Sequence, residues 1–128
     1  MQLRLKTTKV KNLKLSNISK KAEDDAGMNF KFGAAFSETE SNNFLVVFEL
    51  TLNVEDANLS IEYEATFETD EIISDEFKNS HFSKVNAPAI AFPYLRAFIS
   101  TFLLNSGYDP VMLPSVNFAA LDKQNSDS

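Results

Sequence analysis

A long apolar stretch at residues 86–105, NAPAIAFPYLRAFISTFLLN, constrains this fold more than any other feature of the sequence. Asn86 and Pro88 predict a helix start, because Asn caps free N–H groups and Pro fits the first turn. Gly107 predicts the helix end. The result is a helix of roughly 18 residues, about 27 Å long. Its plainly polar interior residues are Arg96, Ser100 and Thr101.

This helix is apolar on nearly all sides, whereas a surface helix of a small domain shows a single apolar stripe. Stable membrane insertion is disfavoured, because the run falls short of about 20 residues and contains Pro93 and Arg96. A second partner besides the chain's own sheet must therefore cover it. We expect that partner to be partly another copy of the chain and partly a bound polypeptide.

The 128 residues predict one domain, residues 1–121, followed by a disordered tail, residues 122–128. The chain contains no cysteine, so a disulfide framework and a thiolate metal site are excluded. The first residues lack the apolar run of a secretory signal. We therefore expect a cytoplasmic protein.

Charge is distributed unevenly along the chain, whose net charge is -6. Residues 1–22 contain seven basic residues and no acid, whereas residues 23–76 contain fifteen acids and one base, Lys31. An acidic chain is a poor general binder of nucleic acid, so nucleic-acid binding by the basic opening is the less favoured alternative. We interpret the pattern as a basic strand lying beside acidic strands of one sheet.

Alternating apolar residues predict four strands, at residues 2–16, 30–36, 44–54 and 59–67. In the first, the apolar residues change from odd to even positions near residues 9–11, which predicts a bulge or a break in the strand there. A polar connection over residues 69–85 follows, in which Asp75 could cap a short helical turn. The long helix comes next, and Phe118 begins a short last helix. Strands grouped before helices indicate an α+β fold, with an antiparallel sheet covered on one face.

The sequence offers no convincing catalytic site. The single histidine, His81, lies in a polar connector, and the three glycines form no phosphate-binding loop. Glu62, Glu64 and Glu68 could in principle pair carboxylates or bind a cation, but on an exposed strand face they are more simply a solvated surface. We therefore expect no enzyme activity, no metal and no cofactor.

Phenylalanine is unusually frequent, at twelve of 128 residues. Most must pack in the core, but an apolar surplus marks an interaction site. Aromatic side chains suit flexible partners, because they bind through contact area with little sequence specificity. The candidates for contact with a client or another copy, of which core burial could claim half, are Phe44, Phe48, Phe92, Tyr94, Phe98 and Phe102.

Two motifs give the chain a family resemblance. The helix holds Pro88 and the triplet Phe92-Pro93-Tyr94, followed two residues later by Arg96; a segment with Pro114, Asn117 and Phe118 comes after it. In these residues the chain resembles SecB, the cytosolic export chaperone family that binds unfolded polypeptides.

The resemblance implies a four-stranded antiparallel sheet, a long helix and a short last helix. It also implies a homotetramer, a dimer of dimers with the long helices packed between them, and apolar client grooves that need no ATP or cofactor. Docking of the SecA motor on the acidic sheet face is implied as well, here at Glu62, Glu64 and Glu68. The first strand departs from the family, because residues 9–16 carry lysines and no acid.

Three functions remain open at this point. The first is a general holdase for unfolded polypeptides. The second is a dedicated interaction module, such as a SecB-like chaperone of one antitoxin-type partner. The third, least favoured, is a small-ligand carrier with an apolar cavity between sheet and helix.

Overall fold

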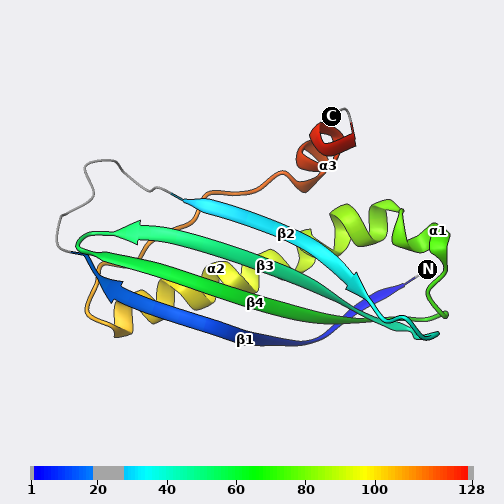
Figure 1. The fold of residues 1–128 in the computed structure, drawn as a ribbon, viewed down its shortest axis with the longest axis horizontal. Helices are drawn as coiled ribbons and strands as arrows, with labels where there is room; N and C mark the ends of the chain where they lie inside the picture. Colours follow the sequence, from blue (N-terminus) through cyan, green and yellow to red (C-terminus); the bar gives the residue numbers. More distant parts are fainter. Residues whose placement is uncertain (1, 19–27, 127–128) are drawn as a thin grey trace.

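The computed structural model describes residues 2–18 and 28–126, and these form a sheet with helices on one face (Figure 1). The sheet contains β1 (Leu3–Asn17), β2 (Asn29–Phe36), β3 (Asn43–Val54) and β4 (Ala57–Thr69). Its order is β1-β4-β3-β2, and every neighbouring pair is antiparallel. The helical segments are α1 (Asp75–Lys78), a π-helical turn η1 (Phe82–Asn86), α2 (Ala87–Asn105) and α3 (Phe118–Ser126). The predicted α+β fold is confirmed.

The central strands β3 and β4 form the floor of the core. Their alternate residues are all buried on the face that α2 covers, from Phe44 to Val54 and from Leu59 to Phe67. The residues between them face outward, and we call that side the outer face. On the helix, the buried residues that pack onto this floor include Ala91, Leu95, Ile99 and Leu103. The strict alternation of apolar and polar residues in β3 and β4 therefore reflects a sheet with one covered face and one open face.

Two bulges keep the apolar residues of β1 on the inner face. The pairing with β4 slips between Leu5 and Thr7 and again between Val10 and Asn12, so Lys6 and Lys11 are the extra residues. Each extra residue reverses the parity of the strand. As a result, the half-buried apolar residues Leu5, Val10 and Leu13 all share one face. The predicted bulge near residues 9–11 is confirmed, and the one at Lys6 is an addition.

The start of the long helix differs from the prediction. Asn86 has helical angles, φ -67° and ψ -47°, and its side chain makes no capping hydrogen bond. The helix instead continues from η1, because Phe82 packs on buried Phe77 with ring centroids 6.1 Å apart. The first turn of α1 is likewise capped by Ser74, whose Oγ accepts from the Phe77 N–H at 3.1 Å, and not by Asp75. Helix α2 thus continues from the turn before it, whereas α1 begins at a local cap one residue earlier than predicted.

The helix end is as predicted, at Gly107. Tyr108 N–H donates to the Leu103 carbonyl at 2.9 Å, and Gly107 N–H donates to the Leu104 carbonyl at 3.3 Å. These two bonds are those of a Schellman motif, with Gly107 at φ +97°. The motif turns the chain back so that residues 108–117 run toward α3 (Figure 1).

Gly107→Ala is expected to lower the free energy of unfolding by about 1–2 kcal/mol, because a side chain disfavours positive φ. Nothing lies within 4 Å of the added Cβ, so backbone strain alone accounts for the loss. Urea unfolding measures it. Gly33→Ala, also with open space around the added Cβ but without a positive φ, is the control and should leave stability nearly unchanged.

The last helix is longer than expected. It was predicted over residues 118–121, followed by a disordered tail, but α3 runs to Ser126. Asn117 Oδ1 accepts from the Ala120 N–H at 3.0 Å and so caps its first turn. Residues 127–128 of the expected tail lie outside the described residues.

By length and composition alone, the continuous helical segment Phe82–Asn105 could cross a membrane. Core helices of soluble proteins pass the same test. Here one side of α2 packs on the sheet through seven buried residues.

Candidate functional site

All twelve phenylalanines lie in aromatic clusters on the helix-covered side of the sheet. The first cluster joins β2, β3, α2 and α3 around Phe118, which is 3% exposed. Its ring centroid lies 4.9 Å from Phe32, 5.6 Å from Phe92 and 6.4 Å from Phe30. Phe48 completes the group at 6.5 Å. We call these five residues the β2-edge cluster.

The second cluster lies at the other end of β2, under α1. Phe44 stacks on Phe36 and Phe67 at 5.5 and 5.4 Å, and Phe77 meets it edge-on at 5.4 Å. Phe82 extends this group through Phe77. Since Phe44, Phe67 and Phe77 are at most 4% exposed, this cluster is core packing.

The third cluster lies along α2. Phe98 packs on Tyr63 of β4 at 6.1 Å and on Phe102 at 5.8 Å, and both phenylalanines are half-buried. Beside them lies an exposed line of helix positions, the α2 stripe. At about 100° per residue, its members fall within about 40° of one line. The α2 stripe consists of Ile90, Tyr94, Ala97, Thr101 and Leu104.

Apart from Thr101, the α2 stripe is apolar, and it lies where the helix faces away from its own sheet. Ile90 is 43% exposed, Tyr94 53% and Leu104 58%. Its spacing alternates four and three residues, which is the spacing of a helix that packs on another helix. The described part of the chain leaves this side uncovered, as the sequence led us to expect.

The predicted contact residues therefore divide into two groups. Phe44, Phe48 and Phe92 are between 0 and 5% exposed and belong to the core. Tyr94 is exposed, and Phe98 and Phe102 are half-buried, so these three remain candidates for contact with a client or another copy.

The sequence reasoning missed other accessible apolar residues. Phe30 and Phe32 are half-buried, because they lie on β2, an edge strand with nothing beside it in the described residues. Their alternation was visible in the sequence, but the strand order that leaves them at an edge was not. Met112, on the segment after α2, is 79% exposed.

The residues of the family motifs have distinct structural roles. Pro88 and Phe92 are buried, whereas Pro93 and Pro114 are exposed. Asn117 caps α3, and Phe118 anchors that helix in the β2-edge cluster. The motif residues thus lie on α2, on the segment that follows it and in the β2-edge cluster, where Phe92 and Phe118 meet.

Arg96 is the motif residue whose side chain is incompletely satisfied. It is half-buried on α2, and its Nε is buried with no hydrogen-bond partner among the described residues. A buried donor without a partner costs about 1–3 kcal/mol. Because this atom is already buried within the single chain, its missing partner does not by itself place Arg96 at an interface.

The outer face carries the predicted acidic row beside a basic one. Glu62, Glu64 and Glu68 point outward from β4 and are half-buried. In the pairing with β1, Arg4 lies opposite Glu68, and Lys9 lies opposite Glu64. The basic residues of β1 therefore lie beside acids of the same sheet, as the charge pattern predicted, whereas Lys20 and Lys21 of the basic opening lie outside the described residues.

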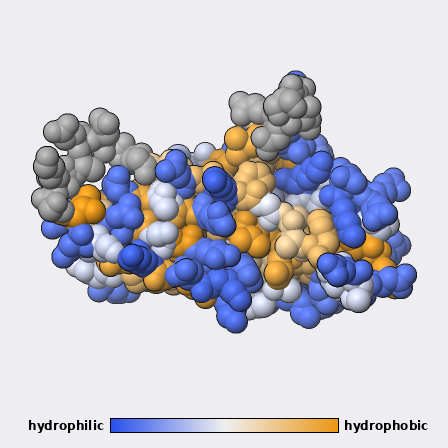
Figure 2. All heavy atoms as spheres, in the orientation of Figure 1, coloured by the Kyte–Doolittle hydropathy of each residue, from blue (hydrophilic) through white to orange (hydrophobic). Residues whose placement is uncertain are grey.

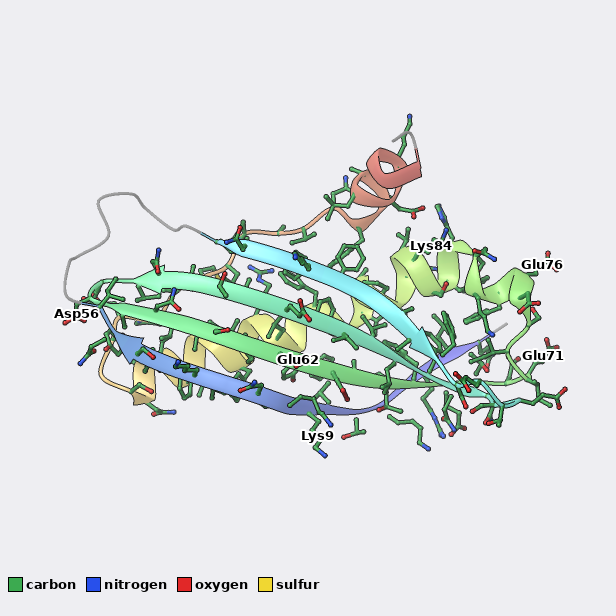
Figure 3. All side chains as sticks on the ribbon, viewed as in Figure 1. Lys9, Asp56, Glu62, Glu71, Glu76 and Lys84 are labelled. Atoms are coloured by element: carbon green, nitrogen blue, oxygen red, sulfur yellow. The ribbon has the colours of Figure 1, made fainter. Side chains whose placement is uncertain are left out.

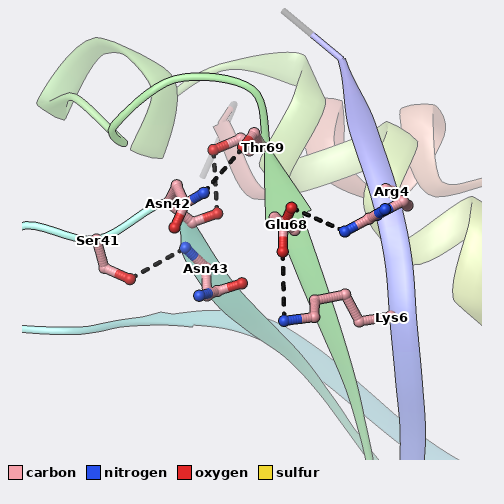
Figure 4. A network of polar contacts seen from close by, with 7 residues as sticks. All are labelled: Arg4, Lys6, Ser41, Asn42, Asn43, Glu68 and Thr69. Atoms are coloured by element: carbon pink, nitrogen blue, oxygen red, sulfur yellow. Dashed lines mark hydrogen bonds and ion pairs between the residues drawn. The ribbon is translucent and has the colours of Figure 1, made fainter.

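One acid of that row is fully engaged. Glu68 Oε1 accepts from Arg4 at 2.8 Å, and its Oε2 lies 3.3 Å from Lys6 Nζ (Figure 4). The negative charge available to a basic partner is reduced accordingly. Among the described residues, no group of three His, Cys, Asp or Glu side chains is arranged to hold a metal ion.

Comparison with known proteins gives one match over nearly the whole chain. The family model described as preprotein translocase subunit SecB matches residues 2–128. An uncharacterized protein of Methanocaldococcus jannaschii is 33% identical over 92 residues, or 67% of this chain. Protein-export protein SecB of Magnetococcus marinus is 49% identical over 37 residues, or 29% of this chain. These matches span 58% and 24% of the lengths of the two relatives.

Two solved structures share the fold. A SecB-like chaperone of Mycobacterium tuberculosis, in complex with a ChAD peptide from the HigA1 antitoxin, superposes with a TM-score of 0.69 at 12% identity, over 89% of each chain. A protein of unknown function from Streptococcus agalactiae superposes with a TM-score of 0.58 at 10% identity, over 90% of this chain and 98% of its own. At such identities the likeness concerns the fold alone.

Proposed function

Because the chain belongs to the SecB family, we propose that it is an ATP-independent holdase for unfolded or partly folded polypeptides in the cytoplasm. The observation that supports this most directly is the pair of half-buried phenylalanines on the edge strand β2, Phe30 and Phe32. Exposed Met112, on the return segment, is a further accessible apolar residue. An apolar client segment that covers them would be stabilised by roughly 25 cal/mol per Å² of buried apolar area. That gain is opposed by the entropy of ordering a flexible client.

The proposal includes a homotetramer built as a dimer of dimers. The α2 stripe would pack against another copy, and the half-buried members of the β2-edge cluster, Phe30 and Phe32, would face clients. The two apolar surfaces then have separate occupants. Several client sites on one assembly would also slow dissociation, because a second segment binds at high effective concentration.

A dedicated chaperone of a single partner is the second candidate. It is favoured by the fold shared with a Mycobacterium tuberculosis chaperone whose structure contains an antitoxin peptide. Delivery to SecA has less support here, because Arg4 and Lys6 neutralise Glu68 in the acidic row. Capture from a lysate separates the two candidates, since a general holdase retains many unfolded proteins and a dedicated one retains a single protein.

The holdase proposal predicts that near-stoichiometric protein suppresses the aggregation of a chemically denatured client, followed by light scattering. Phe32→Ala should raise the concentration needed for half-suppression several-fold, because it removes a half-buried ring from the proposed client surface. Lys31→Ala, on the outer face of the same strand, is the matched control. Unchanged aggregation with the natural chain would refute the proposal.

A further inference from the structure

We propose that a row of lysines on the outer face binds an acidic polypeptide segment, which is a different surface and a different partner from those of the holdase. The row follows β1, whose five basic residues are all exposed: Arg4, Lys6, Lys9, Lys11 and Lys14. Within Leu3–Asn17 there is no acid. Figure 3 shows Lys9 projecting from β1 at the rim of the sheet, with Glu62 farther in on β4.

The two bulges of β1 create this row. Lys6 and Lys11 are the extra residues of the bulges, so each adds a cation to the exposed side of the strand without displacing an inward apolar residue. Arg4 and Lys14 pair with β4 residues eight positions apart, so the five cations extend over about 26 Å at roughly 3.3 Å per residue. The strand therefore concentrates positive charge in a chain whose net charge is -6.

Only part of this charge is neutralised internally. Arg4 and Lys6 share Glu68. Lys9, Lys11 and Lys14 make no ion pair with the residues that the structure describes. These three lysines, the free part of the row, are available to carboxylates of another chain.

The shape and surroundings of the row favour an extended acidic polypeptide. Figure 2 shows this face of the molecule. Hydrophilic side chains cover β1 at the lower rim, and above them apolar side chains are visible between hydrophilic ones. A single extended chain can follow the rim, whereas a nucleic-acid duplex would also press its phosphates against Glu62 and Glu64. A second copy of this chain offering the same row would bring like charges together. The acidic segment is the partner whose charge complements the row without these penalties.

The test is titration of a fluorescently labelled oligoglutamate peptide with the full chain at low ionic strength, followed by anisotropy. The variant combines Lys9→Glu, Lys11→Glu and Lys14→Glu. The control combines Lys31→Glu, Lys84→Glu and Lys123→Glu, which reverses the same number of exposed charges elsewhere. We expect the affinity to fall at least tenfold in the first variant and less than threefold in the control, and salt to weaken the binding of the natural chain.

A second variant and a check of folding distinguish loss of charge from loss of structure. The corresponding triple Lys→Gln variant should show an intermediate loss, and circular dichroism should show both variants folded. Absence of peptide binding, or an equal loss in the control, would overturn the proposal. Tighter binding of a DNA oligonucleotide than of the peptide would assign the row to nucleic acid instead. A change in sedimentation mass in the Lys→Glu variant would assign it to contact between copies.

Discussion

Phe48→Ala is expected to destabilise the protein by about 3–5 kcal/mol, the usual cost of removing a large buried aromatic side chain. Phe48 is 0% exposed, and its ring lies 5.9 Å from Phe30 and 6.1 Å from Phe92. Truncation would leave a cavity where β3, β2 and α2 meet. The loss includes the aromatic contacts as well as the buried area. Urea unfolding followed by circular dichroism measures the change.

Leu45→Ala is the matched control, because it lies on the outer face of the same strand and is only partly buried. It should cost clearly less than Phe48→Ala. A Phe48→Ala variant that kept its stability but failed to suppress client aggregation would mean that Phe48 lines a client groove. The comparison therefore tests the division of the candidate residues into core and surface.

The fold was predictable because the sheet has one covered face. Alternation in β3 and β4 follows directly from burial on that face, so the strands could be located from sequence alone. The second bulge of the irregular strand β1 could also be predicted. Val10 lies at an even position, whereas Leu5 and Leu13 lie at odd positions, so an extra residue is needed to keep all three on one face. The first bulge stayed hidden, because the residues between Leu5 and Val10 show no apolar alternation.

Helix boundaries were less predictable, for a physical reason. Asn86 has the chemistry of a cap, but the helical turn before it contains Phe82, which packs on Phe77 and so favours a helix that continues through Asn86. A cap stabilises a helix by about 1 kcal/mol, a small term that packing of a half-buried ring can offset. Tertiary packing therefore prevailed over the local signal.

The candidate site depended on strand order, which the sequence did not contain. Phe30 and Phe48 both alternate cleanly, but β2 is an edge strand and β3 is a central one, so Phe30 is half-buried and Phe48 is fully buried. The ion pairs of the sheet likewise depended on how the strands are paired. That basic β1 would lie beside acidic β4 could be predicted, whereas the ion pairs that Arg4 and Lys6 make with Glu68 required the register.

The α2 stripe leads to the second large expected effect. Leu104→Asp or Ile90→Asp should reduce the solution mass of the protein by at least half, because each places a charge in the proposed contact between copies. Both residues are exposed in the single chain, at 58 and 43%, so we expect the monomer to stay folded, which circular dichroism checks. Sedimentation equilibrium at micromolar concentration measures the mass.

Ala89→Asp is the control for this experiment, since it adds the same charge to an exposed position of α2 outside the stripe. Its mass should equal that of the natural chain. A natural chain that is already monomeric would refute the proposed tetramer and leave the α2 stripe free for clients. If Leu104→Asp separates the copies and Phe32→Ala weakens only client binding, the helix and the sheet edge have the separate roles that their exposures suggest. Loss of both properties in either variant would instead mean that clients bind between copies.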